Sequence, residues 1–352
     1  MNVNHTMSPV RKAVLGLLAP LVYTSSVMAT ENTVESTPDV GVTPYIVNGS
    51  NASVTDFPSM ASLFIDRIEY DGVYSTGPYC GARILDPTHI LTAAHCIYGD
   101  ENAQLFTVVV PQLEDTSQFP NNIVQKARVS EVYYRSDYSN ALSDLLRNDV
   151  AILKLESALN IDSINDVVQR PSDETYRNVA NDFVAVGHGD TRTGFDGTTL
   201  LQQANLNYVD NATCKTVFAA GNELTENQIC FVGDVGASGL YGGTCQGDSG
   251  GPVYWKDGSI YRQVGITSFG PETCGASSRV TSVFTEIYDY KDWIDSVIAG
   301  TETAKFISTD AKRSASAGTS ASTGSGSSGG SVSFGLLGML MLIAGVRKAV
   351  KR

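Results

Sequence analysis

Three residues that could together activate a hydroxyl nucleophile lie far apart in this sequence. Ser249 lies in the run Gly-Asp-Ser-Gly-Gly-Pro, His95 in Leu-Thr-Ala-Ala-His-Cys, and Asp149 in Asn-Asp-Val-Ala-Ile-Leu. A serine hydroxyl is a weak nucleophile, so it needs a base such as imidazole, and a carboxylate can hold that imidazole in the required tautomer. The sequence therefore predicts that Ser249 attacks a carbonyl, with His95 as base and Asp149 as its orienting partner.

The glycines around Ser249 predict both space for a substrate and donors for an oxyanion. Gly250 and Gly251 leave room for an approaching carbonyl group. Gly247 has no side chain and can turn its N–H the same way as that of Ser249. The amides of Gly247 and Ser249 are thus the predicted oxyanion hole. A surface turn is the alternative, because these residue types are common in turns, but the six-residue run is far more specific than a turn requires.

The order His, Asp, Ser within these flanking sequences resembles the chymotrypsin/trypsin family of serine endopeptidases, over about residues 46–300. The resemblance implies an all-β fold of two six-stranded antiparallel barrels with a C-terminal helix. It places His95 and Asp149 on one barrel and Ser249 on the other, with the cleft between them. It also implies hydrolysis of peptide bonds in protein or peptide substrates, without a cofactor. A catalytically inactive binding protein on this scaffold is the alternative, but such proteins usually lose a triad residue.

The run Ile-Val-Asn-Gly that begins at Ile46 resembles the N-terminus that zymogens of this family expose on cleavage. Asp248 adjoins the nucleophile, and burying its carboxylate unpaired would cost several kcal/mol. A freed Ile46 ammonium could pair with Asp248 and set the Gly247 amide in place. We therefore expect no activity until the bond after Tyr45 is cut. Because this pairing raises the pKa of the ammonium above about 8, activity should fall at more alkaline pH.

The resemblance also implies a pocket for the substrate side chain, formed by Gly243, Thr244, Ser268, Phe269, Gly270 and Ser282. Gly243 stands where trypsin-like members carry an aspartate, so the pocket lacks the charge that attracts Lys or Arg. Ser268 and Gly270 would pair with the substrate backbone, and Gly270 leaves the entrance open. These features predict a preference for aromatic or medium apolar side chains. Since Tyr45 precedes the activation bond, the enzyme or a close sibling could activate its own precursor.

The six cysteines all lie within residues 46–300, and an even number in an exported chain favours disulfides. Six cysteines allow 15 pairings, and the family resemblance selects Cys80–Cys96, Cys214–Cys230 and Cys245–Cys274. Zinc is the competing explanation, but no CxxC pair is present, so we expect no metal site. The net charge of −13 disfavours nucleic acid as a partner.

Short apolar runs rich in β-branched residues predict strands at 105–110, 129–133, 150–155, 183–186, 228–232 and 260–268. Many short strands indicate a barrel or a sandwich. The apolar residues Ile287, Tyr290, Ile294 and Val297 recur at helical spacing, and Gly300 follows where a helix would stop. We expect this helix to pack on the core.

The two ends of the chain have the composition of processing segments. Residues 1–29 have a basic start, a short apolar run and a small residue at the cleavage point, which is typical of a secretion signal. Residues 30–45 are polar and read as a propeptide. The protease domain is expected at 46–300, and residues 301–331 read as a Ser/Gly-rich linker.

Residues 332–352 combine a short hydrophobic segment with a basic end. As a helix, the apolar part would span about 22 Å, less than the roughly 30 Å of bilayer hydrocarbon. With the preceding Gly-Gly-Ser, it resembles the GlyGly-CTERM sorting tails of exported proteins in Gram-negative bacteria. The resemblance implies export machinery and a rhomboid-like sorting protease as partners, and secretion or display at the cell surface. A lasting single-pass anchor is the alternative.

Overall fold

The computed structural model describes residues 46–121 and 124–322. The predicted signal peptide (1–29), propeptide (30–45) and hydrophobic tail (332–352) lie outside the described residues. Within the described ranges, no helix combines the length and the apolar character needed to cross a bilayer.

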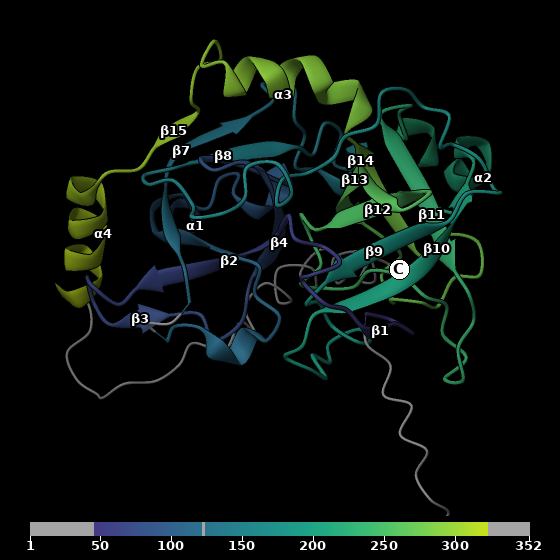
Figure 1. Cartoon of the computed structure of the whole chain (residues 1–352), viewed down its shortest axis with the longest axis horizontal. Helices are drawn as coiled ribbons and strands as arrows, with labels where there is room; N and C mark the ends of the chain where they lie inside the picture. Colours follow the sequence, from purple (N-terminus) through teal and green to yellow (C-terminus); the bar gives the residue numbers. More distant parts are fainter. Residues whose placement is uncertain (1–45, 122–123, 323–352) are drawn as a thin grey trace, which may run out of the picture. The chain divides into compact units, whose positions relative to one another are not determined.

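Barrel 1 is a closed antiparallel sheet of six strands (Figure 1). In their order around the barrel the strands are β7 (Ala127–Tyr134), β6 (Thr107–Pro111), β2 (Met60–Arg67), β4 (Cys80–Asp86), β5 (His89–Thr92) and β8 (Ala151–Leu155). The pairing of β7 with β8 closes the ring. Two short strands extend its edges: β3 (Val73–Tyr74) on β2, and β15 (Phe306–Ile307) on β7. Apolar side chains from every strand of the ring fill the interior, as β-branched and aliphatic strand residues do.

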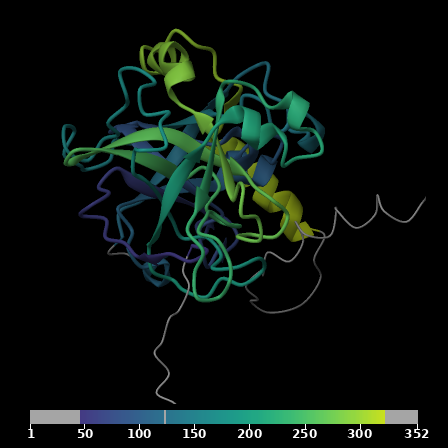
Figure 2. The same ribbon diagram turned by 90° about the vertical axis from the view of Figure 1, so that its right-hand side faces the viewer.

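Barrel 2 is built in the same way from the second half of the chain (Figure 2). In order around the barrel the strands are β9 (Phe183–Gly187), β10 (Gln202–Val209), β11 (Gln228–Gly233), β14 (Ser282–Glu286), β13 (Ile260–Phe269) and β12 (Pro252–Asp257). The ring closes through β9, which pairs with both β10 and β12. The short β1 (Ser50–Asn51) adds to the edge of β10. The predicted fold class, two six-stranded antiparallel barrels, is confirmed.

The barrels meet where two glycines approach each other. A Cβ atom on Gly81 of β4 would lie 2.9 Å from the Cα atom of Gly251, which immediately precedes β12. Contact this close requires a residue without a side chain. The meeting point therefore lies beside Ser249, two residues before Gly251.

One predicted strand begins as a helix. Residues 105 and 106 end α1 (Glu101–Phe106), and strand β6 starts only at Thr107. The side chain of Asp100 caps α1 by accepting a hydrogen bond from the amide of Ala103. The apolar run at 105–110 contains no break at Thr107, so its pattern could not separate the buried end of a helix from the strand that follows it.

The C-terminal helix was predicted correctly. It is α3 (Lys291–Ile298), preceded by the 3₁₀ turn η5 (Tyr288–Tyr290). The four residues of its apolar stripe are almost completely buried in the core of barrel 1: Ile287, Tyr290, Ile294 and Val297. Gly300 has φ +71°, the left-handed conformation in which helices often end. The other short helical segments are α2 (Asn211–Lys215), η1 (Ala94–Cys96), η2 (Thr116–Gln118), η3 (Leu142–Asp144) and η4 (Gly221–Glu223).

The structure differs from the linker expected at 301–331 in the first part of that segment. Strand β15 pairs with β7, and α4 (Asp310–Ser322) follows it. The Ser/Ala/Gly composition suggested a flexible chain. However, Ala and Ser are compatible with a helix, and Arg313 inside α4 is buried with four hydrogen bonds. The remainder, residues 323–331, lies outside the described residues.

Candidate active site

His95 and Asp149 lie together at one end of barrel 1. His95 lies in η1, shortly after β5, and Asp149 lies two residues before β8. Strands β5 and β8 pair at Thr92 and Ala151, so both side chains start from the same edge. Asp149 Oδ2 is 2.7 Å from His95 Nδ1, and Asp149 Oδ1 accepts the His95 main-chain N–H at 2.8 Å. Because Nδ1 is engaged by the carboxylate, Nε2 is the ring nitrogen left for proton transfer.

The surroundings of His95 favour its charged form. Burial alone would lower the pKa of the imidazole, but the charge of Asp149 and its hydrogen bond raise that pKa above the usual 6.5. Asp149 is completely buried, whereas the His95 side chain keeps 21% of its surface exposed. The imidazole can therefore reach a ligand and hold a proton that it accepts.

Two residues of barrel 2 hold Asp149 in place, and the sequence analysis assigned neither to this role. Ser268 Oγ donates a hydrogen bond to Asp149 Oδ2 at 2.6 Å, and Thr285 Oγ1 donates to the main-chain oxygen of Asp149 at 2.9 Å. Ser268 was predicted only as a partner of the substrate backbone. The two residues are separated from Asp149 by 119 and 136 positions, so no local pattern could reveal the contacts.

Ser249 lies in the turn that precedes β12, packed directly against barrel 1. Its main-chain oxygen accepts a hydrogen bond from the Gly81 amide at 2.7 Å. The next residue, Gly250, has φ +75°, and a Cβ atom there would lie 2.2 Å from Thr92 Oγ1. Thr92 is three residues before His95, so the turn abuts the segment that carries the imidazole. The hydroxyl of Ser249 makes no hydrogen bond to His95 in the described structure. Such bonds are often long without substrate.

The three predicted disulfides are all present: Cys80–Cys96, Cys214–Cys230 and Cys245–Cys274. Cys96 is next to His95, and Cys80 is next to Gly81. The first bridge therefore ties the segment carrying His95 to the strand that contacts the Ser249 turn. Cys80, His95 and Cys96 lie close enough to suggest a metal cluster, but both sulfurs belong to this disulfide and are not free thiolates.

Asp248 is buried with only 1% of its surface exposed. Its Oδ1 accepts the amide of Gly189 at 2.8 Å, and its Oδ2 accepts the amide of Cys245 at 2.9 Å. Burial raises the pKa of Asp248 to about 7, even though these two hydrogen bonds act in the opposite direction. Within residues 46–121 and 124–322, no cation forms an ion pair with it. A negative charge on Asp248 is thus uncompensated in the uncleaved chain.

The segment that begins at Ile46 is also buried, beside the same region of barrel 2. Ile46 and Val47 have no exposed surface, and the Gly243 amide donates to the Val47 oxygen at 3.2 Å. Ile46 has φ +31°, which is unfavourable for a β-branched residue. Cutting the bond after Tyr45 would remove this constraint, because an N-terminal residue has no preceding carbonyl.

The protein-family model described as Trypsin matches residues 46–294, which is most of the described chain. The chain belongs to the trypsin family. A venom serine protease of Polistes dominula is 30% identical over 254 residues, covering 69% of this chain and 84% of the relative. Human chymotrypsin-like elastase family member 1 is 31% identical over 259 residues, covering 72% of this chain and 92% of the relative.

Among solved structures, neuropsin from mouse brain superposes on this trypsin-family chain with a TM-score of 0.58. It is 24% identical and covers 72% of this chain and 100% of its own, so it supports the fold alone. The predicted serine endopeptidase, a hydrolase of peptide bonds, is confirmed by the family match and the two relatives. These relatives are from a wasp and a human, so the expected Gram-negative source and GlyGly-CTERM-like tail stay predictions.

The residues predicted to line the substrate pocket of this trypsin-family protease converge around Thr281, which the sequence analysis did not single out. The main-chain N–H and Oγ1 of Thr244 donate to Ser282 Oγ at 2.9 and 3.0 Å. A Cβ atom on Gly243 would lie 2.7 Å from the Thr281 Cβ, and one on Gly270 would lie 2.7 Å from the Thr281 oxygen. Glycine is therefore required at both positions.

Two other predicted pocket residues have further contacts. Phe269 packs edge-on against Phe218, with ring centroids 5.3 Å apart. Ser268 directs its hydroxyl to Asp149, which leaves only its main chain for a substrate. Of the predicted pocket, Gly243, Thr244 and Ser282 are thus in mutual contact.

Glycines around Asp248 form the tightest part of this protease. A Cβ atom on Gly187 would lie 2.1 Å from Asp248 Oδ1, and one on Gly189 would lie 2.4 Å from Asp248 Cγ. Gly247 has φ +93°, and a Cβ atom there would lie 3.0 Å from the Gly189 Cα. The conformation predicted to orient the Gly247 amide therefore depends on two glycines, at 187 and 189, that sequence analysis did not identify.

Substituting Gly189→Ala should disturb both stability and activity. The added methyl group must displace the Asp248 carboxylate or the backbone beside it, which we expect to lower stability by about 2–4 kcal/mol, in the range of overpacked cores. The peptidase activity of the cleaved enzyme should fall at least about tenfold. Gly77→Ala is the matched control, because nothing lies within 4 Å of a Cβ atom there. Equal melting temperatures for the two variants would contradict this account of Gly189.

Proposed function

We propose that this trypsin-family chain is an exported serine endopeptidase whose catalytic triad is Ser249, His95 and Asp149. The observation that carries the proposal is the buried Asp149 carboxylate, 2.7 Å from His95 Nδ1, on the edge of barrel 1 against which the Ser249 turn packs. This arrangement leaves His95 Nε2 available on the side of the imidazole away from Asp149.

In the proposed reaction, Ser249 Oγ attacks the carbonyl carbon of the scissile peptide bond and His95 Nε2 accepts its proton. The negative charge that develops on the carbonyl oxygen is stabilised by the amides of Gly247 and Ser249. His95 then gives its proton to the leaving amine, and the acyl group remains on Ser249. Water, deprotonated by His95, hydrolyses the ester in the second half of the reaction. Asp149 stays ionised and stabilises the imidazolium in both halves.

A fluorophosphonate tests the proposed roles, because it bonds covalently only to an activated serine. The expected result is one label per chain of the cleaved enzyme, located on Ser249 by peptide mapping and absent from His95→Ala. The alternative, an inactive binding protein on this scaffold, requires that the wild-type protein take up no label.

We infer that the chain is made as a zymogen, activated by cleavage before Ile46. Two observations support this step: the buried, uncompensated carboxyl of Asp248 and the complete burial of Ile46. The new ammonium would supply the missing cation. Its charge would hold Asp248 ionised and, through the chain, fix the Gly247 amide next to it.

We also propose that the substrate pocket prefers aromatic or medium apolar side chains. The base of the predicted pocket has no carboxylate at Gly243, and the hydroxyl of Ser282 is already satisfied by Thr244. An arginine or lysine side chain would therefore lose its hydration without gaining a counter-charge.

Peptides that differ only in the residue before the scissile bond should show this preference. With Tyr, Phe or Leu at that position, we expect kcat/KM at least about 100-fold higher than with Arg or Lys, a difference of roughly 2.7 kcal/mol. Profiling a peptide library with the enzyme cleaved at Ile46 provides the measurement. Faster cleavage after Arg would show that the pocket contains a negative charge from elsewhere in the chain.

Export is supported by the three disulfides, which persist in oxidising compartments. We propose that residues 1–29 direct export and that residues 332–352 act as a sorting tail removed by a rhomboid-like protease. Mass spectrometry of the extracellular form should then find no peptide containing Leu340.

A further inference from the structure

The chain continues past α3 and docks on the outside of barrel 1. The Trypsin match ends at residue 294, so this extension lies beyond it. Phe306 and Ile307 of β15 pair with Val132 and Glu131 of β7, and α4 follows at the end of Figure 1 farthest from the strands of barrel 2. We call residues 304–317 the strap.

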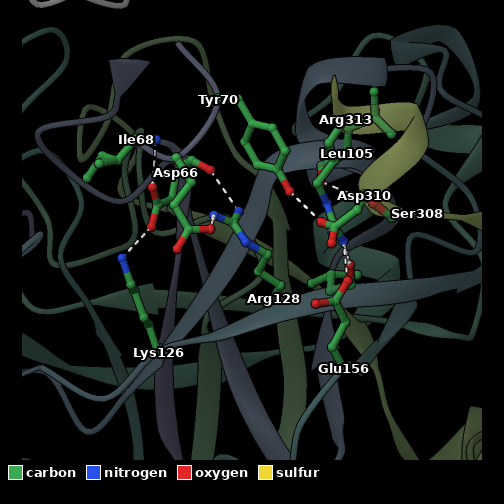
Figure 3. A network of polar contacts seen from close by, with 12 residues as sticks. Asp66, Ile68, Tyr70, Leu105, Lys126, Arg128, Glu156, Ser308, Asp310 and Arg313 are labelled. Carbon is green, nitrogen blue, oxygen red and sulfur yellow. Dashed lines mark hydrogen bonds and ion pairs between the residues drawn. The ribbon is translucent and has the colours of Figure 1, made fainter. Parts of the chain in front are cut away.

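The strap is fixed by one buried arginine. The Arg313 side chain is only 1% exposed. Its Nε donates to the Leu105 oxygen at 2.7 Å, and its Nη2 donates to the Val129 oxygen at 3.0 Å and to Glu156 Oε1 at 2.5 Å (Figure 3). Its Nη1 donates to Asp310 Oδ1 at 3.1 Å. All three nitrogens of the guanidinium are therefore satisfied, in a geometry that the single ammonium of lysine cannot reproduce.

The acceptors that Arg313 uses belong to barrel 1 and its helix. Leu105 lies in the last turn of α1, where helix carbonyls lack partners and a positive charge is favourable. Ser308 Oγ donates to the same oxygen at 3.1 Å. Leu105 and Val129 are themselves buried. Removing the strap would leave polar acceptors in an apolar setting, which costs stability.

A second anchor joins the strap to the turn after β2. The Tyr70 hydroxyl donates to Asp310 Oδ1 at 2.7 Å, and the Tyr70 ring packs against Phe106 of α1 (Figure 3). Arg128 stacks on the other side of this contact, 5.3 Å from the Tyr70 ring centroid, and donates to the Asp66 oxygen at 2.8 Å. The strap is thus held from two directions, by α1 and by the β2–β3 turn.

We propose that the strap is a permanent part of the folded protease, and that it presents the C-terminal tail from the end of barrel 1 opposite the active site. Strand β8 connects the two places: it begins just after Asp149 and ends just before Glu156. At about 3.4 Å per residue, its five residues separate them by roughly 17 Å. A tail leaving beyond Gly318 therefore starts away from the cleft. Sorting or anchoring through the tail can proceed without obstructing Ser249, and processing cuts after the strap.

Hydrogen–deuterium exchange on the full chain carrying Ser249→Ala tests the docking, and it needs no peptidase activity. Amides of the strap should be protected. Arg313→Ala should raise exchange at least about tenfold in the strap, α1 and β7, and leave β9–β14 unchanged. Lys312→Ala is the matched control: its side chain is exposed, and its single bond to the Ile307 oxygen at 2.6 Å lies at the surface.

Tyr70→Phe removes only the second anchor and covers the case in which Arg313→Ala does not fold. It should raise exchange at the start of α4 about two- to tenfold. The proposal is wrong if the strap exchanges as fast as unstructured chain, or if neither substitution changes its exchange. The placement has its own test in the active protein: kcat/KM of Arg313→Ala should stay within about threefold of the unsubstituted enzyme, and a loss above tenfold would overturn it. Failure of the triad proposal would leave the exchange result unaffected.

Discussion

Replacing Ser249 by alanine is expected to lower kcat about 10⁶-fold on a peptide substrate, with the fold unchanged. His95→Ala should cost about as much, because neither group accomplishes nucleophilic attack without the other. Their effects should not add: the double variant should be no slower than either single variant, since the residual rate comes from substrate binding and the oxyanion donors. Steady-state kinetics on the enzyme cleaved at Ile46 provides the measurement.

Asp149→Asn is the companion variant, expected to lower kcat about 10⁴-fold by stabilising the wrong tautomer of His95. It also carries a pH signature. His95 acts as a base only when neutral, and Asp149 raises its pKa above 6.5, so kcat/KM should fall as the pH drops through that raised value. Without the Asp149 charge the pKa should be lower, and the acid limb should move to lower pH. If the double variant Ser249→Ala/His95→Ala is much slower than the single ones, the residues do not act as one unit.

The precursor with the bond after Tyr45 intact is expected to be at least about 10³-fold less active than the cleaved enzyme, the cost of losing an oxyanion donor. In the precursor, Asp248 is buried without a cation, and its pKa is raised to about 7. Asp248→Asn in the cleaved enzyme removes the charge while keeping the size of the side chain. It should lower kcat by about 10²–10³-fold, because the Ile46 ammonium then has no counter-charge.

The same group gives the precursor a pH-dependent stability. The pKa of Asp248 is higher in the folded precursor, at about 7, than its ordinary 3.8 in the unfolded chain. The folded state therefore binds the extra proton, and this contribution to stability is present at low pH and lost as the pH rises to about 7. Pairing with the Ile46 ammonium should remove the loss. Calorimetry should find that the melting temperatures of the cleaved and uncleaved proteins diverge from pH 5 to pH 8, and a constant difference would contradict the pairing.

Self-activation follows from the identity of Tyr45 and the uncharged pocket. The Ser249→Ala precursor should stay intact when incubated alone and should be cut before Ile46 by a trace of active enzyme. If active enzyme leaves it intact while trypsin converts it, another protease activates the chain.

Local motifs were enough to identify the residues proposed for catalysis, because Ser249, His95 and Asp149 each lie in a distinctive run of neighbours. The strands and the disulfides followed from alternation, β-branched composition and resemblance. Contacts between distant segments could not be predicted in this way. Ser268 holds Asp149, and Gly189 holds Asp248, through bonds across 119 and 59 positions. The strap was missed because Arg313 stands within a Ser/Ala-rich stretch, where composition hides the acceptors that bury it.

The crystal structure of the cleaved enzyme with a phosphonate on Ser249 tests the central claim most directly. The account predicts that the phosphorus is bonded to Ser249 Oγ and that His95 Nε2 lies within about 3.2 Å of a phosphonate oxygen or of Oγ. Another phosphonate oxygen should accept from the amides of Gly247 and Ser249, with the Ile46 ammonium against Asp248. An imidazole of His95 remote from Ser249 in that structure would contradict catalysis by this triad.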